Sequence, residues 1–200
     1  MKQKITQLLI ITIGTLALFT GCQEELKIGQ ERVIESSKRS QPNWVKRPPK
    51  ANRKHVFFVG QDTSFENDNR YAYQMALSDV SSYISTKTNN LFKRTEQSLN
   101  NEESIKMRQS LIKNTSNAAI NGAEKREIYW EKIEKLNEEG FKYFYKVYVL
   151  VAVSQDAIKN SQKATLQIEK EKQKEASNEE IKAMLNALQK ELESEQLETE

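Results

Sequence analysis

Residues 141–153 constrain the fold most, because they predict a β-strand that is apolar on both faces. Alternate positions on one face carry aromatic and valine side chains, namely Phe141, Tyr143, Tyr145, Val147, Val149, Val151 and Val153. The other face carries Phe144, Tyr148, Leu150 and Ala152. Such a strand lies in the centre of a sheet, or has one face covered by helices and the other by a second copy of the protein.

The neighbouring sequence predicts the strand's partner. Residues 127–133 are a second strand-like run, and the polar turn at 136–140 ends in Gly140, so the two runs form an antiparallel hairpin. A shorter aromatic and β-branched run at 55–60 predicts another strand. Residues 82–95 are rich in Ser, Thr and Asn and predict a change from helix to strand.

Three helices are expected. Thr63 and Glu66 have the spacing of a capping box before a helix. That helix has an apolar stripe at Tyr73, Ala76, Leu77, Val80, Tyr83 and Ile84. A second helix starts at 100–103 and ends near Gly122, with a weak apolar face at Ile105, Arg108, Ile112 and Ala119. Residues 155–196 contain no Gly or Pro and predict a long charged helix.

These elements give an α+β fold class: a small antiparallel sheet packed by one or two helices, followed by a long charged C-terminal helix. Residues 42–153 form the α+β domain, and residues 154–200 form a charged helical tail. Residues 22–41 are polar and weakly patterned, and predict a tether. The Trp44-Val45 pair, between Pro42 and Pro48, is expected to dock the start of the domain onto its core.

Residues 1–21 predict a signal peptide. A basic start with Lys2 and Lys4 precedes an apolar run that is too short to be a stable membrane span. The run ends in Phe19-Thr20-Gly21-Cys22, which resembles the lipobox of bacterial lipoproteins, although Leu is commoner than Phe at the first position. Cys22 would carry acyl chains such as palmitate, two or three of which hold a protein on a bilayer. A buried or incidental cysteine is the alternative.

Composition argues against catalysis. The chain of 200 residues has one histidine and one cysteine, which removes multi-cysteine metal sites and most histidine-based catalytic sites. No phosphate-binding loop, nucleophile elbow or His-Glu-x-x-His pair occurs. We therefore expect no enzyme activity, no cofactor, no metal site and no nucleic-acid partner. Seven basic residues between 38 and 54 without an acid leave two readings open, contact with anionic headgroups or a solvated linker.

Aromatic residues are the candidates for interaction. Most belong to the core, but an excess that one thin sheet cannot bury would mark an oligomer interface. The candidates are Trp44, Phe57, Trp130, Tyr143 and Tyr145.

The chain resembles the LPP-twenty family of small outer-membrane lipoproteins, whose relatives include a flagellar basal-disc lipoprotein. The resemblance spans residues 42–153 and is carried by five groups of residues: Pro42-x-Trp44-Val45-x-x-Pro48-Pro49, Phe58-Val59-Gly60, the helix with Ala72, Ala76 and Asp79, Trp130, and Tyr148-Val149-Leu150-Val151. It implies a compact α+β domain, assembly into rings or discs beneath the outer membrane, and no catalytic residue.

Two functions follow as hypotheses. The first is a structural lipoprotein of the outer membrane, anchored at Cys22 and facing the periplasm, that self-assembles in the cell envelope, with the flagellum as one candidate location. Gln23 after the cysteine, in place of Asp, favours the outer membrane by the sorting rules of lipoproteins. The alternative is a monomeric periplasmic module that binds another envelope protein.

Overall fold

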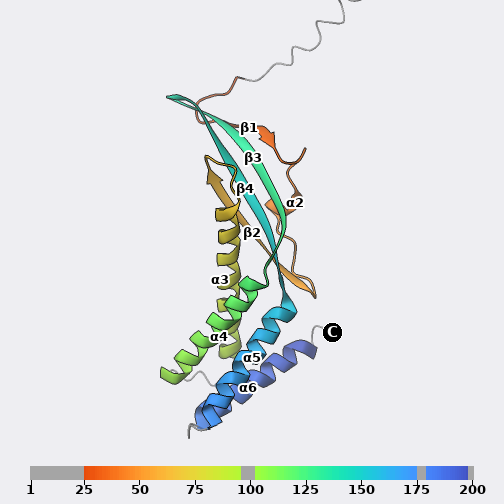
Figure 1. Ribbon diagram of the computed structural model, residues 1–200, viewed down its shortest axis with the longest axis vertical. Helices are drawn as coiled ribbons and strands as arrows, with labels where there is room; N and C mark the ends of the chain where they lie inside the picture. Colours follow the sequence, from red (N-terminus) through yellow and green to blue (C-terminus); the bar gives the residue numbers. More distant parts are fainter. Residues whose placement is uncertain (1–24, 96–101, 175–178, 198–200) are drawn as a thin grey trace, which may run out of the picture.

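The computed structural model describes residues 25–95, 102–174 and 179–197. The described elements, in chain order, are β1 (Glu31–Ser36), α2 (Asn43–Lys46), β2 (His55–Ser64), α3 (Arg70–Arg94), α4 (Glu102–Asn121), β3 (Glu124–Asn137), β4 (Gly140–Ser154), α5 (Gln155–Lys174) and α6 (Glu179–Leu197). The protein is of the α+β class, as the sequence predicted. It is elongated, with the β3–β4 turn at one end and helices α4, α5 and α6 at the other (Figure 1).

The sheet is antiparallel, with strand order β1-β3-β4-β2. The predicted hairpin is confirmed: β3 and β4 pair from Glu124↔Ala152 to Asn137↔Gly140. The turn requires a glycine at position 140, because the backbone φ there is 119° and residues with a side chain rarely adopt such an angle. Because β4 pairs with both β3 and β2, it is a central strand, as expected of a strand that is apolar on both faces.

Each face of β4 supports a different core, and α2 and α3 lie on opposite sides of the sheet (Figure 1). The sheet–helix core joins β4 to α3, α4 and α5 through Ala72, Ala76, Val80, Ile84, Ala119, Val147, Val149, Val151, Val153 and Ile158. The Trp44 core on the opposite face comprises Trp44, Tyr129, Tyr148 and Leu150. The prediction that Trp44 docks the start of the domain is thus confirmed.

A third cluster, the helical core, lies at the far end of the molecule. It consists of residues from α3, α4, α5 and α6: Leu91, Phe92, Met107, Leu111, Leu166, Ile181, Met184, Leu185, Leu188 and Leu192. Residues 155–174 and 179–197 are helical, as predicted. They form two helices where the sequence predicted one, and the two run side by side in opposite directions (Figure 1), with the side chains of Lys170 and Gln189 hydrogen-bonded between them. The segment expected as a tail thus contributes six of the ten residues of the helical core.

Three buried polar residues, Thr88, Thr115 and Gln162, separate the sheet–helix core from the helical core. Each lies about one turn from apolar residues of both cores along its own helix. Both amide atoms of Gln162 and the hydroxyls of Thr88 and Thr115 have no hydrogen-bond partner within the described ranges. A buried polar group without a partner opposes folding, so this layer lowers the stability that burial of the interior provides.

Four sequence predictions need correction. Residues 31–36 of the expected tether form β1, which pairs with β3. Thr63 lies in β2 and does not cap a helix, since α3 begins at Arg70, whose backbone N–H donates to Asp68 Oδ1 at 2.9 Å. Residues 82–94 continue α3 and form no strand. The apolar face expected for the second helix is right only in part, because α4 buries Ala119 but also Met107 and Leu111, and leaves Ile105 exposed.

Helix α3 approaches β2 closely because its contact residues are small. Ala72 and Ala76 are fully buried over Gly60. A Cβ atom added at Gly60 would lie 1.7 Å from the carbonyl oxygen of Ala72 and 2.6 Å from the amide nitrogen of Ala76. Both neighbours are backbone atoms, so only glycine allows this spacing.

We expect Gly60→Ala to lower the free energy of unfolding by about 3 kcal/mol, because α3 must move away from β2. Urea denaturation of the two proteins measures the difference. Gly122→Ala is the matched control, since its Cβ would lie 3.3 Å from the nearest atom, the carbonyl oxygen of Ala118, and should cost less than about 1 kcal/mol. Equal losses for the two variants would contradict the close contact.

Candidate functional site

The side of the sheet that carries α3 is only partly covered by that helix. Helix α3 packs on β2 and β4. The register places Ile128, Trp130 and Lys132 of β3 beside Val149, Val147 and Tyr145 of β4, on this same side. Ile128 and Tyr143 remain 36% and 47% exposed. We name Ile128, Trp130, Lys132, Tyr143 and Tyr145 the aromatic strip.

The aromatic strip is held in a fixed arrangement. The rings of Trp130 and Tyr145 meet edge to face, with centroids 5.8 Å apart. Lys132 Nζ lies 5.8 Å from the centre of the Tyr145 ring, a cation–π contact. The backbone of Trp130 is tied to Ser37, whose N–H donates to the Trp130 carbonyl and whose hydroxyl accepts from the Trp130 N–H, both at 3.0 Å.

A charged group borders the strip near the hairpin turn. Arg32 of β1 forms an ion pair with Glu134 of β3, and the Tyr143 hydroxyl donates to Glu134 Oε1 at 3.0 Å. The hydrogen bond from Arg32 lowers the pKa of Glu134, and the bond from Tyr143 adds to this effect. The same Glu134 raises the pKa of Tyr143. These groups fix the orientation of the Tyr143 ring at the surface.

The structure separates the five aromatic residues that the sequence singled out. Trp130, Tyr143 and Tyr145 come together in the aromatic strip. Trp44 belongs to the Trp44 core on the opposite face, and Phe57 packs against that core. Trp44 is 8% exposed and its Nε1 donates to Glu127 Oε2 at 3.2 Å. These two residues have a structural role and are no longer candidates for the interaction surface. Cys22 lies outside the described residues.

Sequence analysis missed Ile128, Lys132, Glu134 and Arg32. Ile128 and Lys132 could have been found, because they alternate with Trp130 along the predicted strand and therefore share its face. Glu134 continues the same alternation one residue beyond the predicted end of that strand. Arg32 gave no such signal, since β1 was not expected.

Within the described residues, no group of three His, Cys, Asp or Glu side chains has the arrangement of a metal site. None of the described helices is both long and apolar enough to cross a bilayer. His55, the sole histidine of the chain, is the first residue of β2. Its ring lies near the ring of Phe57, with centroids 6.1 Å apart, and its Nε2 lies 3.3 Å from the Arg126 guanidinium. The aromatic strip itself leaves Ile128 and Tyr143 partly exposed beside the ordered rings of Trp130 and Tyr145.

Comparison with protein-family models, curated proteins and solved structures gave no match to this chain.

The contacts of Glu134 with Arg32 and Tyr143 predict how the stability of the folded chain changes at acidic pH. The pKa of Glu134 is lower in the folded chain than its ordinary 4.5, so its contribution to stability is complete above that value. The contribution is lost as the pH falls through the lowered pKa. We expect the free energy of unfolding to fall more steeply below pH 4.5 in the wild type than in Glu134→Gln, measured by urea titration at several pH values.

Glu180→Gln on the exposed face of α6 serves as the control and should keep the wild-type slope. A Glu134→Gln curve that runs parallel to the wild type at every pH would show that the Arg32–Glu134 pair has no such role.

Proposed function

We propose that this protein is a lipid-anchored, non-catalytic lipoprotein of the outer membrane that faces the periplasm and self-assembles into an envelope structure. The aromatic strip carries the self-assembly part of the proposal. It presents ordered aromatic rings beside exposed Ile128 and Tyr143, and interfaces draw most of their energy from such aromatic residues.

The open sheet supports the same proposal. Strands β1 and β2 each have one neighbour among the described strands, and form the two edges of the sheet. An edge strand offers unpaired backbone groups to another chain. Contacts between unlike surfaces of identical copies generate rings when the rotation closes, which agrees with the assembly that the LPP-twenty resemblance implies.

The anchor part rests on the sequence around Cys22. An apolar segment ends at Phe19, and only the Thr20-Gly21 pair lies between it and Cys22, the single cysteine of the chain. A flagellar location rests on the family resemblance alone, and loss of swimming with intact flagella in a deletion strain would support it.

Lipidation is tested with labelled palmitate in growing cells. We expect the wild type to take up label and to separate with membranes, and Cys22→Ala to take up none, because its side chain has no thiol to acylate. Phe19→Leu is the control and should keep the label, since Leu is commoner at this position of a lipobox. Labelling of Cys22→Ala, or an unlabelled wild type, would contradict the anchor.

Self-assembly is tested on the lipidated chain in detergent. Replacing both exposed residues of the strip, Ile128→Ser with Tyr143→Ser, should raise the concentration at which oligomers form by roughly tenfold. Analytical ultracentrifugation measures this concentration. Tyr71→Ser, at an exposed site on α3, is the control and should leave it unchanged. A wild type that stays monomeric at high concentration would reject self-assembly and favour the alternative, a module that binds another envelope protein.

A further inference from the structure

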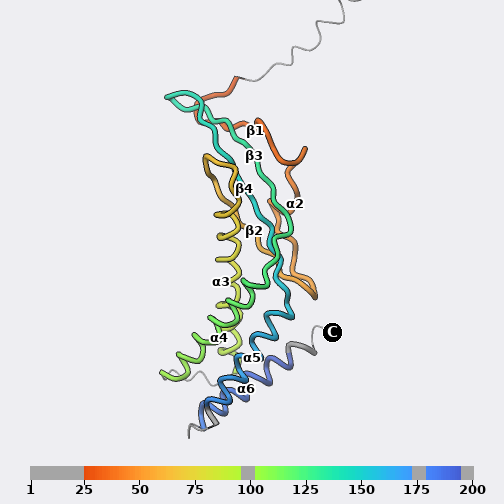
Figure 2. The backbone as a smooth tube through the Cα atoms, viewed as in Figure 1, coloured from red at the N-terminus to blue at the C-terminus, as the bar shows by residue number. Residues whose placement is uncertain are grey.

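The end of the molecule that carries the β3–β4 turn is where the described chain begins. The Gly29 N–H donates to the Leu136 carbonyl at 2.7 Å, and the Leu136 N–H donates to the Gln30 carbonyl at 3.3 Å. These bonds fasten the N-terminal segment to the hairpin beside its turn, and the tube in Figure 2 shows the two segments together at this end.

Exposed apolar side chains gather at this hairpin end. Phe65 is 83% exposed, Ile28 67% and Phe141 53%. Ile28 adjoins Gly29, and Phe141 pairs across the hairpin with Leu136. Phe65 lines a shallow groove together with residues of the hairpin, including Lys142 and Phe144. Apolar side chains grouped in this way mark a surface that contacts something.

The charges at the hairpin end largely cancel. Lys142 Nζ lies 3.1 Å from Glu139 Oε2, and Lys135 Nζ lies 3.2 Å from Glu31 Oε1. The basic stretch at 38–54 does not reinforce this end, because it continues along the sheet to Asn52, which is bonded to Gln155 at the start of α5. The surface is therefore suited to an apolar contact with polar headgroups around it, more than to electrostatic attraction.

The short segment between Cys22 and Gly29 limits how far the hairpin end can lie from a lipid on Cys22. Gly29 lies seven residues after Cys22, and a fully extended chain over these seven steps spans at most about 25 Å. A lipid on Cys22 therefore holds the hairpin end near the bilayer surface. Tethering at this distance raises the local concentration, so even a weak contact is populated.

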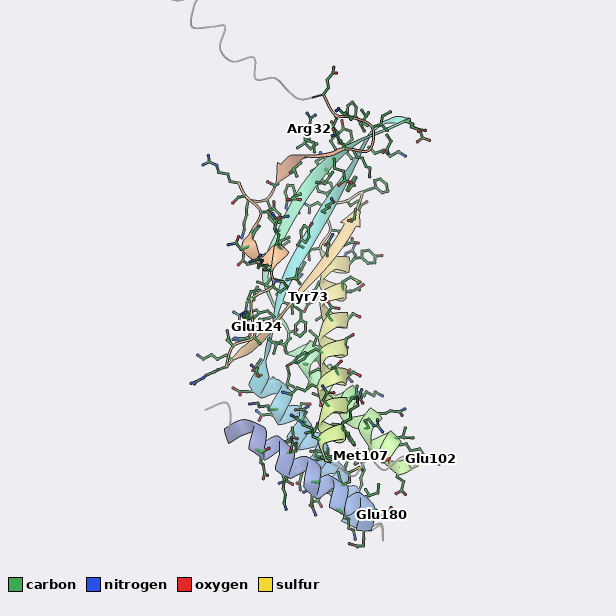
Figure 3. All side chains as sticks on the ribbon, turned by 180° about the vertical axis from the view of Figure 1, so that it is seen from behind. Arg32, Tyr73, Glu102, Met107, Glu124 and Glu180 are labelled. Atoms are coloured by element: carbon green, nitrogen blue, oxygen red, sulfur yellow. The ribbon has the colours of Figure 1, made fainter. Side chains whose placement is uncertain are left out.

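We propose that the hairpin end, with Ile28, Phe65 and Phe141, rests in the headgroup region of the bilayer to which the chain is anchored. The proposal rests on the lipid anchor at Cys22. In this orientation the long axis stands away from the membrane, and the helical core faces the periplasm. Figure 3 shows the two ends, with Arg32 near the hairpin and with Glu102, Met107 and Glu180 among the helices far from it.

The experiment uses the full chain, matured in cells and reconstituted into phosphatidylethanolamine and phosphatidylglycerol vesicles with spin-labelled headgroups. Cys22 is the only cysteine and is occupied by lipid, so an introduced cysteine can be labelled alone with a fluorescent probe. Glu139→Cys marks the hairpin turn, and Glu180→Cys marks the helical end. We expect roughly threefold stronger quenching at position 139 than at position 180.

The apolar contact is tested in the Glu139→Cys protein by adding Phe65→Ser and Phe141→Ser. Quenching should fall but stay above the level at position 180, because the lipid still holds the hairpin end near the bilayer, while higher salt should leave the quenching of the Glu139→Cys protein unchanged. Unchanged quenching in the protein with both serines would overturn the apolar contact. Tyr71→Ser, an exposed aromatic on α3, is the control and should keep full quenching.

Mass measurement of the acyl chains separates failure of this proposal from failure of the anchor. Equal quenching at the two positions in a lipidated protein overturns the hairpin contact and leaves the anchor standing. A probe at position 139 that is shielded from solvent but not quenched shows that a second copy covers this end, which also overturns the proposal. Absence of acyl chains overturns both.

Discussion

The close contact between β2 and α3 is the constraint on which the rest of the architecture depends. Because Gly60 lacks a side chain, the backbone of α3 reaches the strand at Ala72 and Ala76. This position directs the later turns of α3 across β4, and so into both of the cores to which it contributes. It also leaves the β3 side of the sheet uncovered, so the aromatic strip is a consequence of where the helix sits.

The two cores joined by α3 differ in how they are made. The sheet–helix core combines small and β-branched side chains of strand and helix, whereas the helical core uses long, flexible side chains such as Leu and Met. The polar layer between them, with Thr88, Thr115 and Gln162, weakens their coupling, since polar groups without partners gain little from burial. Layers of this kind can fix which turns of neighbouring helices face one another.

Sequence reasoning succeeded where one local pattern decided the outcome. The hairpin of β3 and β4 follows from alternation and a turn, and the strip residues Trp130, Tyr143 and Tyr145 follow from the same alternation. It failed where distant partners decided. β1 is a strand because it pairs with β3 and forms ion pairs with it such as Arg32–Glu134. Residues 82–94 stay helical because elements far along the chain bury Ile84, Thr88 and Leu91. The return of α6 onto α5 likewise depends on tertiary packing of a charged sequence.

The pairing of β1 with β3 also sets an order on the folding of a newly made chain. Glu31 and Lys135 are bonded although they are 104 residues apart. The N-terminal segment emerges first, from the ribosome or on the far side of a membrane that the chain crosses, so β1 has no strand to join until most of the protein has emerged. The β3–β4 hairpin, by contrast, closes over two residues and can form as soon as it emerges. The strand nearest the N-terminus is thus among the last to enter the sheet, and completes it from the edge.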